Sequence, residues 1–118
     1  RGGQFIKGKS ADTFAPFGPY LATTDEVPEP NSLRLTLSVN GTVRQNGSTS
    51  DMIFKVPFLV SYISQFMTLL PGDIISTGSP SGVGAGMSPP EFLRPGDTLQ
   101  YSVELLGECC NRVKPCAV

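Results

Sequence analysis

The chain contains no histidine among its 118 residues, and this absence restricts its chemistry more than any other. A conventional catalytic triad needs a histidine base for its serine or cysteine nucleophile, so the chain by itself carries no such triad. Its three cysteines, Cys109, Cys110 and Cys116, are crowded into the last ten residues. Their odd number and their spacing match neither a disulfide framework nor a zinc site. We therefore expect reduced thiols and no zinc.

The chain also has little net charge and no long apolar run. Its net charge is −1 at pH 7 and it has no lysine or arginine cluster, so the basic surface of a nucleic-acid-binding protein is absent. The longest apolar stretch, residues 56–70, is interrupted by four polar side chains. It falls short of the roughly 20 apolar residues that span a bilayer. No signal peptide is recognisable, so the sequence predicts a cytoplasmic protein that binds neither nucleic acid nor membrane.

Turn-forming residues, 13 glycines and 11 prolines, divide the chain into short elements. Leucine and valine alternate with polar residues over 33–39, which predicts a strand with one buried face. The Asn40-Gly41 pair suits a type I′ turn, so residues 42–45 are predicted to return as the partner strand of a hairpin. Apolar side chains then recur at helical spacing over 57–70, which predicts an amphipathic helix that begins at Pro57 and packs on a sheet.

Two Pro-Gly-Asp tripeptides, at 71–73 and 95–97, place proline and glycine where a type II turn needs them. The first is predicted to introduce a short buried strand at 74–75, and the second a longer strand at 99–105. The stretch between these strands, 78–90, is rich in glycine and proline and is predicted to be a loop. One helix among several strands indicates a mainly β (α+β) fold, in which the helix covers one end or face of the sheets.

A phosphate-loop pattern, GxxxxGKS, occurs from Gly3 to Ser10. That motif lies between a strand and a helix, but no strand is visible before it, and the prolines at 11–19 would break a helix. We therefore do not predict nucleotide binding. The loop at 78–84, GSPSGVG, offers backbone N–H groups and small hydroxyls that can hold a carboxylate. An ordinary surface loop is the alternative for this stretch.

Three segments in order carry a resemblance to a known family. They are GKSADTFAPFGP (8–19), LSVNGTVRQNGSTSDMIF (37–54) and LLPGDIISTGSPSGVG (69–84). Together they resemble the fumarylacetoacetate hydrolase family, over about residues 4–113. The resemblance implies a mixed β-sandwich or roll, of which residues 1–118 form a single partial catalytic domain. It also implies a homo-oligomer, usually a dimer.

Members of that family act on small 2-oxo acids and diketo compounds. A divalent Mg²⁺, Mn²⁺ or Ca²⁺ ion commonly binds the oxo acid and stabilises its enolate. Carried over by position, Lys9 matches the family's catalytic lysine beside metal and substrate. Ser79, with Gly78 beside it, matches the hydroxyl residue that holds the substrate carboxylate. The family's metal ligands, a Glu-x-Glu pair and an aspartate, and its histidine precede the matched stretch, so we expect no metal bound by this chain alone.

These implications predict a fragment of a metal-dependent hydrolase or lyase for small 2-oxo or diketo acids. Such an enzyme cleaves a carbon–carbon bond or decarboxylates its substrate through a metal-bound enolate, and the chain alone would be incomplete. Two alternatives stay open. The chain could be a stable, non-catalytic domain that acts by self-association or partner binding, or a separate chain could supply the metal ligands.

Overall fold

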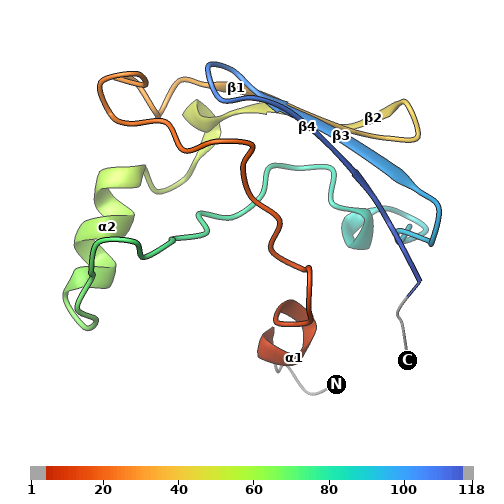
Figure 1. The fold of residues 1–118 in the computed structure, drawn as a ribbon, viewed down its shortest axis with the longest axis horizontal. Helices are drawn as coiled ribbons and strands as arrows, with labels where there is room; N and C mark the ends of the chain where they lie inside the picture. Colours follow the sequence, from red (N-terminus) through yellow and green to blue (C-terminus); the bar gives the residue numbers. More distant parts are fainter. Residues whose placement is uncertain (1–4, 116–118) are drawn as a thin grey trace.

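The computed structural model describes residues 5–115, apart from the side chains of Phe5 and Lys7. Four strands form one antiparallel sheet in the order β2-β1-β3-β4 (Figure 1). The strands are β1 (Arg34–Val39), β2 (Thr42–Ser48), β3 (Thr98–Val103) and β4 (Gly107–Arg112). The α-helices are α1 (Phe5–Lys9) and α2 (Val56–Ser64), and short 3₁₀ turns occupy Thr49–Asp51 and Gly84–Gly86. This is the small α+β fold, dominated by a sheet, that the sequence predicts.

The β1–β2 hairpin is confirmed, including its turn. Asn40 and Gly41 both have positive φ, 51° and 79°, as a type I′ turn requires. The strands pair antiparallel, and their register shifts between Leu37 and Ser38. Gln45 pairs with Leu37 and Val43 with Ser38, so Arg44 is the extra residue of a β-bulge. The bulge positions the candidate site.

Both Pro-Gly-Asp turns form, but only one leads into a strand. Gly72 and Gly96 have φ of 98° and 100°, and each turn is closed by a backbone hydrogen bond to the carbonyl three residues earlier. The second turn leads into β3. The predicted buried strand at 74–75 is wrong, because this segment pairs with no strand in the described part of the chain and Ile74 is 71% exposed.

Two further features of the sheet differ from the prediction. The strand predicted at 99–105 ends at Val103, because Leu105 lies in a turn with φ of 64°. Strand β4 was not predicted from the sequence. Its residues alternate between half-buried and exposed, but the alternating positions carry glycine, cysteine and asparagine, which give no apolar signal.

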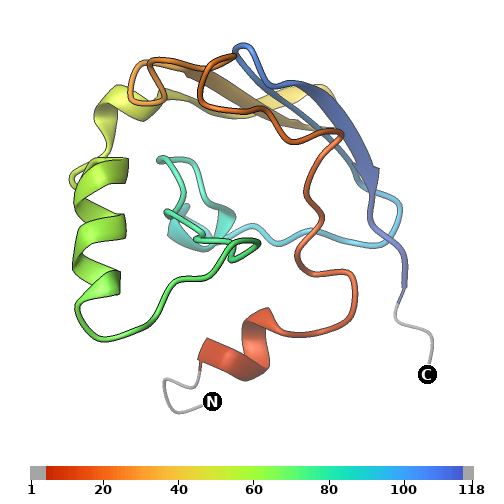
Figure 2. The same cartoon turned by 60° about the vertical axis from the view of Figure 1, so that its left-hand side comes forward.

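The predicted helix forms, but it is shorter than expected and does not pack on the sheet. It begins at Val56, with Pro57 in its first turn, and ends at Ser64. None of its residues is buried. Figure 2 shows α2 standing beside the sheet, with the segment between α2 and β3 crossing beneath the strands. The prediction that the apolar stripe of this helix packs on a sheet is therefore wrong.

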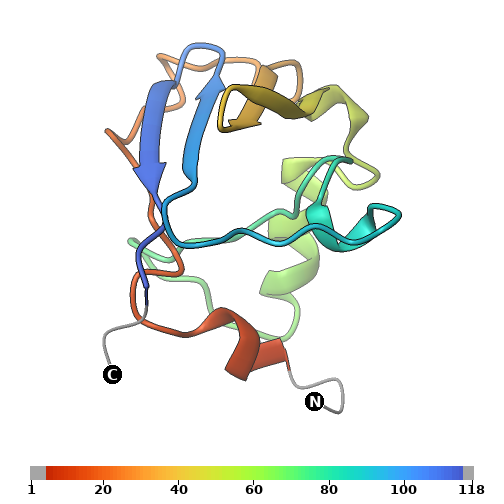
Figure 3. The ribbon, with the colours of Figure 1, turned by 90° about the vertical axis from the view of Figure 1, so that its right-hand side faces the viewer.

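The apolar face of the fold is largely uncovered. Among the described residues only Val27 and Leu33 are buried hydrophobics. The chain exposes 9835 Å², whereas a folded monomer of its mass exposes about 6,200 Å². The excess is about 3,700 Å² by that scaling. Figure 3 shows the resulting open arrangement, in which the sheet, α2 and α1 lie around the segment between α2 and β3. No helix within 5–115 is long and apolar enough to cross a membrane.

One polar clamp ties the hairpin turn to the start of β3. Asn40 Nδ2 donates to Asp97 Oδ1 at 2.9 Å, and Asn40 Oδ1 accepts from the Thr98 backbone at 2.9 Å. The Arg94 backbone N–H also donates to Asp97, at 2.7 Å. The bond from Asn40, followed by that from Arg94, lowers the pKa of the Asp97 carboxyl below its ordinary value of 3.8.

The lowered pKa gives a pH-dependent prediction. A depressed carboxyl pKa stabilises the fold above the unfolded-state value, and this contribution disappears as pH falls through the folded value. Asp97→Asn should therefore unfold at lower urea than the wild type at pH 7, and the two midpoints should converge below about pH 4. Urea denaturation at several pH values measures this. A difference between the two proteins that stays constant with pH would contradict the assignment.

Candidate functional site

The loop at 78–84 lies against β2, at residues 44–47. Gln45 Nε2 donates to the Pro80 carbonyl oxygen at 2.9 Å, and this contact is partly buried. Gly82 has φ of 100°, and a Cβ at this position would overlap the carbonyl oxygen of Arg44. A Cβ on Gly47 would lie 3.3 Å from Pro80 Cβ. Strand and loop thus approach so closely that glycine is required at Gly82.

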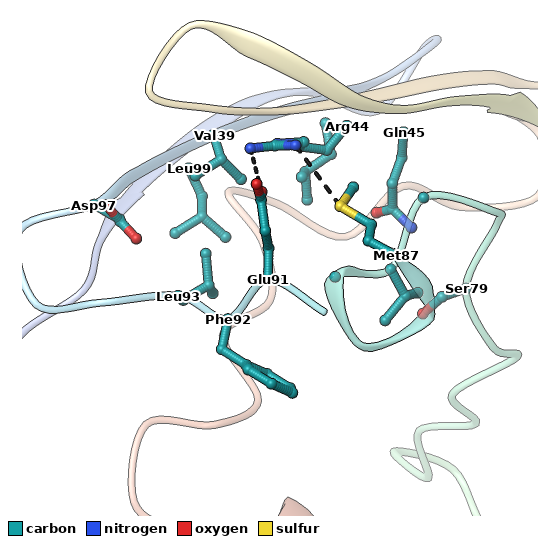
Figure 4. Close-up of a pocket in the computed structure, with 14 residues that line it drawn as sticks. Val39, Arg44, Gln45, Ser79, Met87, Glu91, Phe92, Leu93, Asp97 and Leu99 are labelled. Carbon is teal, nitrogen blue, oxygen red and sulfur yellow. Dashed lines mark hydrogen bonds and ion pairs between the residues drawn. The ribbon is translucent and has the colours of Figure 1, made fainter. Parts of the chain in front are cut away.

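A cavity of about 280 Å³ lies between this loop and the sheet (Figure 4). Ser79 lines it on the loop side, and Arg44 and Gln45 line it on the strand side. Arg44 Nη2 lies 2.5 Å from Glu91 Oε2, and its Nη1 donates to Met87 Sδ at 3.7 Å. The guanidinium of Arg44 is therefore already paired. It links β2 to Met87 and Glu91, which lie on the other side of the cavity.

The structure places the three predicted site residues as follows. Ser79 lines the cavity described above. Gly78 precedes it with φ of 105°, a backbone conformation that favours glycine, and has open space where a Cβ would lie. Lys9, the last residue of α1, is exposed and lines a different cavity with residues 10, 11 and 13–16. Gly78 and Ser79 are thus adjacent in one loop, while Lys9 and Ser79 line separate cavities.

The described residues do not fit a divalent metal site of their own. No group of three or more acidic, cysteine or histidine side chains within 5–115 could hold an ion. The two carboxylates that line the same cavity as Ser79 already have partners: Glu91 pairs with Arg44, and Asp97 accepts from Asn40 and the Arg94 backbone. Mg²⁺ and Mn²⁺ require several oxygen ligands in near-ideal geometry, which these side chains do not offer.

Sequence reasoning missed Arg44 and Gln45 as cavity residues, because it assigned them only to the partner strand of the predicted hairpin. In a regular strand, neighbouring side chains point to opposite faces, so one of the two would face away from the cavity. The β-bulge at Arg44 allows both to face it. The position of a bulge depends on the pairing of two strands, and the one-dimensional pattern of β2 does not reveal it. The cysteines Cys109 and Cys110 are free, as expected, while Cys116 lies outside the described residues.

Comparisons with known proteins show the family to which the chain belongs. A family model described as the fumarylacetoacetate (FAA) hydrolase C-terminal region matches residues 1–114. A mitochondrial oxaloacetate tautomerase of Bos taurus is 48% identical over 112 residues, which are 95% of this chain and 36% of the relative. The chain spans about two fifths of the length of the curated relatives that it matches.

Solved structures show the same fold. A fumarylacetoacetate hydrolase from Exiguobacterium antarcticum has a TM-score of 0.90 and 45% identity, over 94% of this chain and 40% of the other. A maleylpyruvate hydrolase from Sphingobium sp. SYK-6, in complex with manganese(II) and pyruvate, has a TM-score of 0.78 and 39% identity, over 87% and 36% of the two chains. With a family model that covers nearly its whole length, the chain belongs to the fumarylacetoacetate hydrolase family.

Proposed function

We propose that this chain is the carboxylate-holding part of a metal-dependent hydrolase or lyase for small 2-oxo or diketo acids. The observation that carries the proposal is the placement of Ser79 in a cavity wall, on a glycine-containing loop fixed against β2. The names of the relatives supply further support, because they describe enzymes of small organic acids, one of them bound to manganese(II) and pyruvate. The reaction proposed is carbon–carbon cleavage or decarboxylation through an enolate.

Ser79 and Gly78 have the chemistry to hold a carboxylate. The Ser79 hydroxyl and the backbone N–H groups of the loop are donors, and hydrogen bonds to an ionised acceptor are roughly twice as strong as neutral ones. Gly78 has no side chain and open space beside it, so a ligand can approach the backbone closely. Apolar residues of the same cavity, such as Met87, would exclude water from the remainder of a short acid.

Lys9 would act on the oxo end of the same substrate. Its ammonium group can stabilise the negative charge that develops on an enolate oxygen, or donate a proton to the enolate carbon. The proposal therefore requires Lys9 Nζ and Ser79 Oγ to reach one bound molecule. It assigns the ligands of the metal ion to polypeptide outside the described residues, which corresponds to the other three fifths of the relatives' length.

Oxalate, an analogue of the enolate of a 2-oxo acid, tests the carboxylate site in this chain. The amide resonances of Gly78 and Ser79 should shift on titration, and Ser79→Ala should weaken binding about tenfold, because a hydrogen bond to a charged group is lost. Ser81→Ala is the matched control, since Ser81 is a hydroxyl residue of the same loop that does not line the cavity. Shifts that avoid Gly78 and Ser79, or equal losses in both variants, would refute the proposal.

Titration calorimetry with Mn²⁺ tests whether the chain alone is a complete metal site. With oxalate present, the proposal expects no Mn²⁺ binding in the micromolar range. Micromolar binding that depends on oxalate would mean that the chain assembles a whole site by itself, and the partial assignment would be wrong.

The uncovered surface favours a second candidate, a domain that acts by self-association. An excess of about 3,700 Å² is far more than the roughly 800 Å² that each partner buries in a standard interface. Large hydrophobic side chains such as Phe58 and Tyr62 are exposed on this surface, and exposed apolar patches favour association.

A further inference from the structure

The segment that carries Ser79 has little to hold it in place. Its backbone contains glycines at positive φ, Gly78 at 105° and Gly82 at 100°, and glycine loses more conformational freedom on folding than any other residue. Across residues 74–82, no backbone–backbone hydrogen bond forms within the described part of the chain. A segment with so few internal bonds takes its conformation from contacts with its neighbours.

The hydrogen bond from Gln45 Nε2 to the Pro80 carbonyl oxygen, 2.9 Å long, is the single hydrogen bond that residues 74–82 make to other described residues. Pro80 directly follows Ser79, so the bond restrains the Pro80–Ser81 peptide unit, one residue beyond the candidate carboxylate-binding hydroxyl. The β-bulge at Arg44 lets Gln45 face the loop. Close approach of Gly82 to the Arg44 backbone holds the far end of the same loop without a further hydrogen bond.

We infer that Gln45 is a positioning residue, which holds Ser79 toward the cavity by fixing the Pro80 carbonyl. The expected effect of Gln45 on carboxylate binding rests on the proposed function. The expected effect of Gln45 on the order of the loop does not. Without the amide donor, the loop would exchange among conformations, and only some of them would present the Ser79 hydroxyl and its neighbouring N–H groups to a carboxylate. Apparent affinity falls in proportion to the population that is competent to bind.

Gln45→Met tests the inference, because methionine keeps the length of the side chain and removes the donor. The NMR order parameters of the Ser79 and Gly82 amides should fall from values typical of rigid backbone, about 0.85, to below about 0.6. The dissociation constant for oxalate should rise about fivefold, and the urea midpoint should stay unchanged, since no element other than this loop depends on the bond. Gln100→Met is the matched control: Gln100 is an exposed strand residue whose side chain makes no hydrogen bond within the described structure.

Gln45→Glu adds a pH-dependent readout that general destabilisation would not produce. An ionised glutamate cannot donate to the Pro80 carbonyl, whereas a protonated one can. Loop order in this variant should be low at pH 7 and should recover below about pH 4.3, the ordinary glutamate value, while the wild type stays ordered at both pH values.

The two proposals fail in different ways. If the wild type binds no oxalate at Ser79, the proposed function fails, and the order parameters still decide the role of Gln45. If Gln45→Met leaves the loop as ordered as in the wild type, the inference about Gln45 is overturned, whatever the oxalate affinity. Equal effects of Gln45→Met and Gln100→Met would overturn it as well.

Discussion

Gly82→Ala is expected to weaken the affinity for a carboxylate at Ser79 by about 100-fold. Two effects act together at this position. Its φ of 100° strains any residue with a side chain, and the new Cβ would overlap the Arg44 carbonyl oxygen. Because few contacts hold the loop, the least costly response is for it to move away from β2, which breaks the Gln45–Pro80 bond. A displacement of about 1 Å at a binding group is enough for an effect of this size.

Oxalate titration followed by the Gly78 and Ser79 resonances measures this loss. Gly86→Ala provides the matched control, because Gly86 lies in the 3₁₀ turn of the same connection, has open space at its Cβ and does not have a positive φ. It should bind oxalate like the wild type. Wild-type affinity in Gly82→Ala would show that the contact between loop and strand does not shape the carboxylate site.

Local patterns predicted those parts of the fold that local interactions decide. The Asn40-Gly41 turn formed because both residues accept positive φ, and the alternation of 33–39 matched a strand whose Leu37 and Val39 line the cavity. The strand expected at 74–75 failed for the opposite reason. Two isoleucines describe a segment suited to burial, but a strand needs a partner for its backbone, and the described residues supply none there.

The candidate site was predicted in part. The glycine and hydroxyl pattern identified the loop that carries Gly78 and Ser79, because glycines leave backbone N–H groups accessible and small hydroxyls add further donors. The contribution of Gln45 could not be predicted, since it depends on a β-bulge and on the loop approaching β2 from a distant part of the sequence. The relation between Lys9 and Ser79 was implied by resemblance alone, and the structure places the two residues in separate cavities.

The second large effect is expected in self-association. Four aromatic rings, spaced four residues apart, form a continuous exposed ladder along α2 and its flanks, with neighbouring ring centroids 4.9, 6.1 and 5.4 Å apart. Each ring is at least 50% exposed. The ladder consists of Phe54, Phe58, Tyr62 and Phe66. Aromatic side chains in such patches dominate the energy of protein interfaces, and truncation of one hot-spot residue costs about 2 kcal/mol or more.

We expect the chain to associate at micromolar concentration, and the double variant Phe58→Ser/Tyr62→Ser to weaken association at least about 100-fold. Sedimentation equilibrium over a range of concentrations measures both. Val43→Ser is the control, because Val43 is an apolar residue outside the ladder that is 61% exposed. It pairs with Ser38, which lines a cavity on the face of the sheet opposite to that of Leu37. A wild type that stays monomeric, or an equal loss in Val43→Ser, would contradict the role of the ladder.

The size of the assembly also discriminates between the two proposed functions. A standard dimer covers about 800 Å² on each copy, which would leave roughly 2,900 Å² of the excess surface exposed. A discrete dimer alone would therefore not account for the open face. Covering the remainder requires either larger assemblies of this chain or additional polypeptide. The relatives contain such polypeptide, because about three fifths of their length lies outside the part that this chain matches. A well-defined dimer that still binds apolar dyes strongly would thus favour the partial-enzyme proposal, whereas a closed higher oligomer without dye binding would favour self-association.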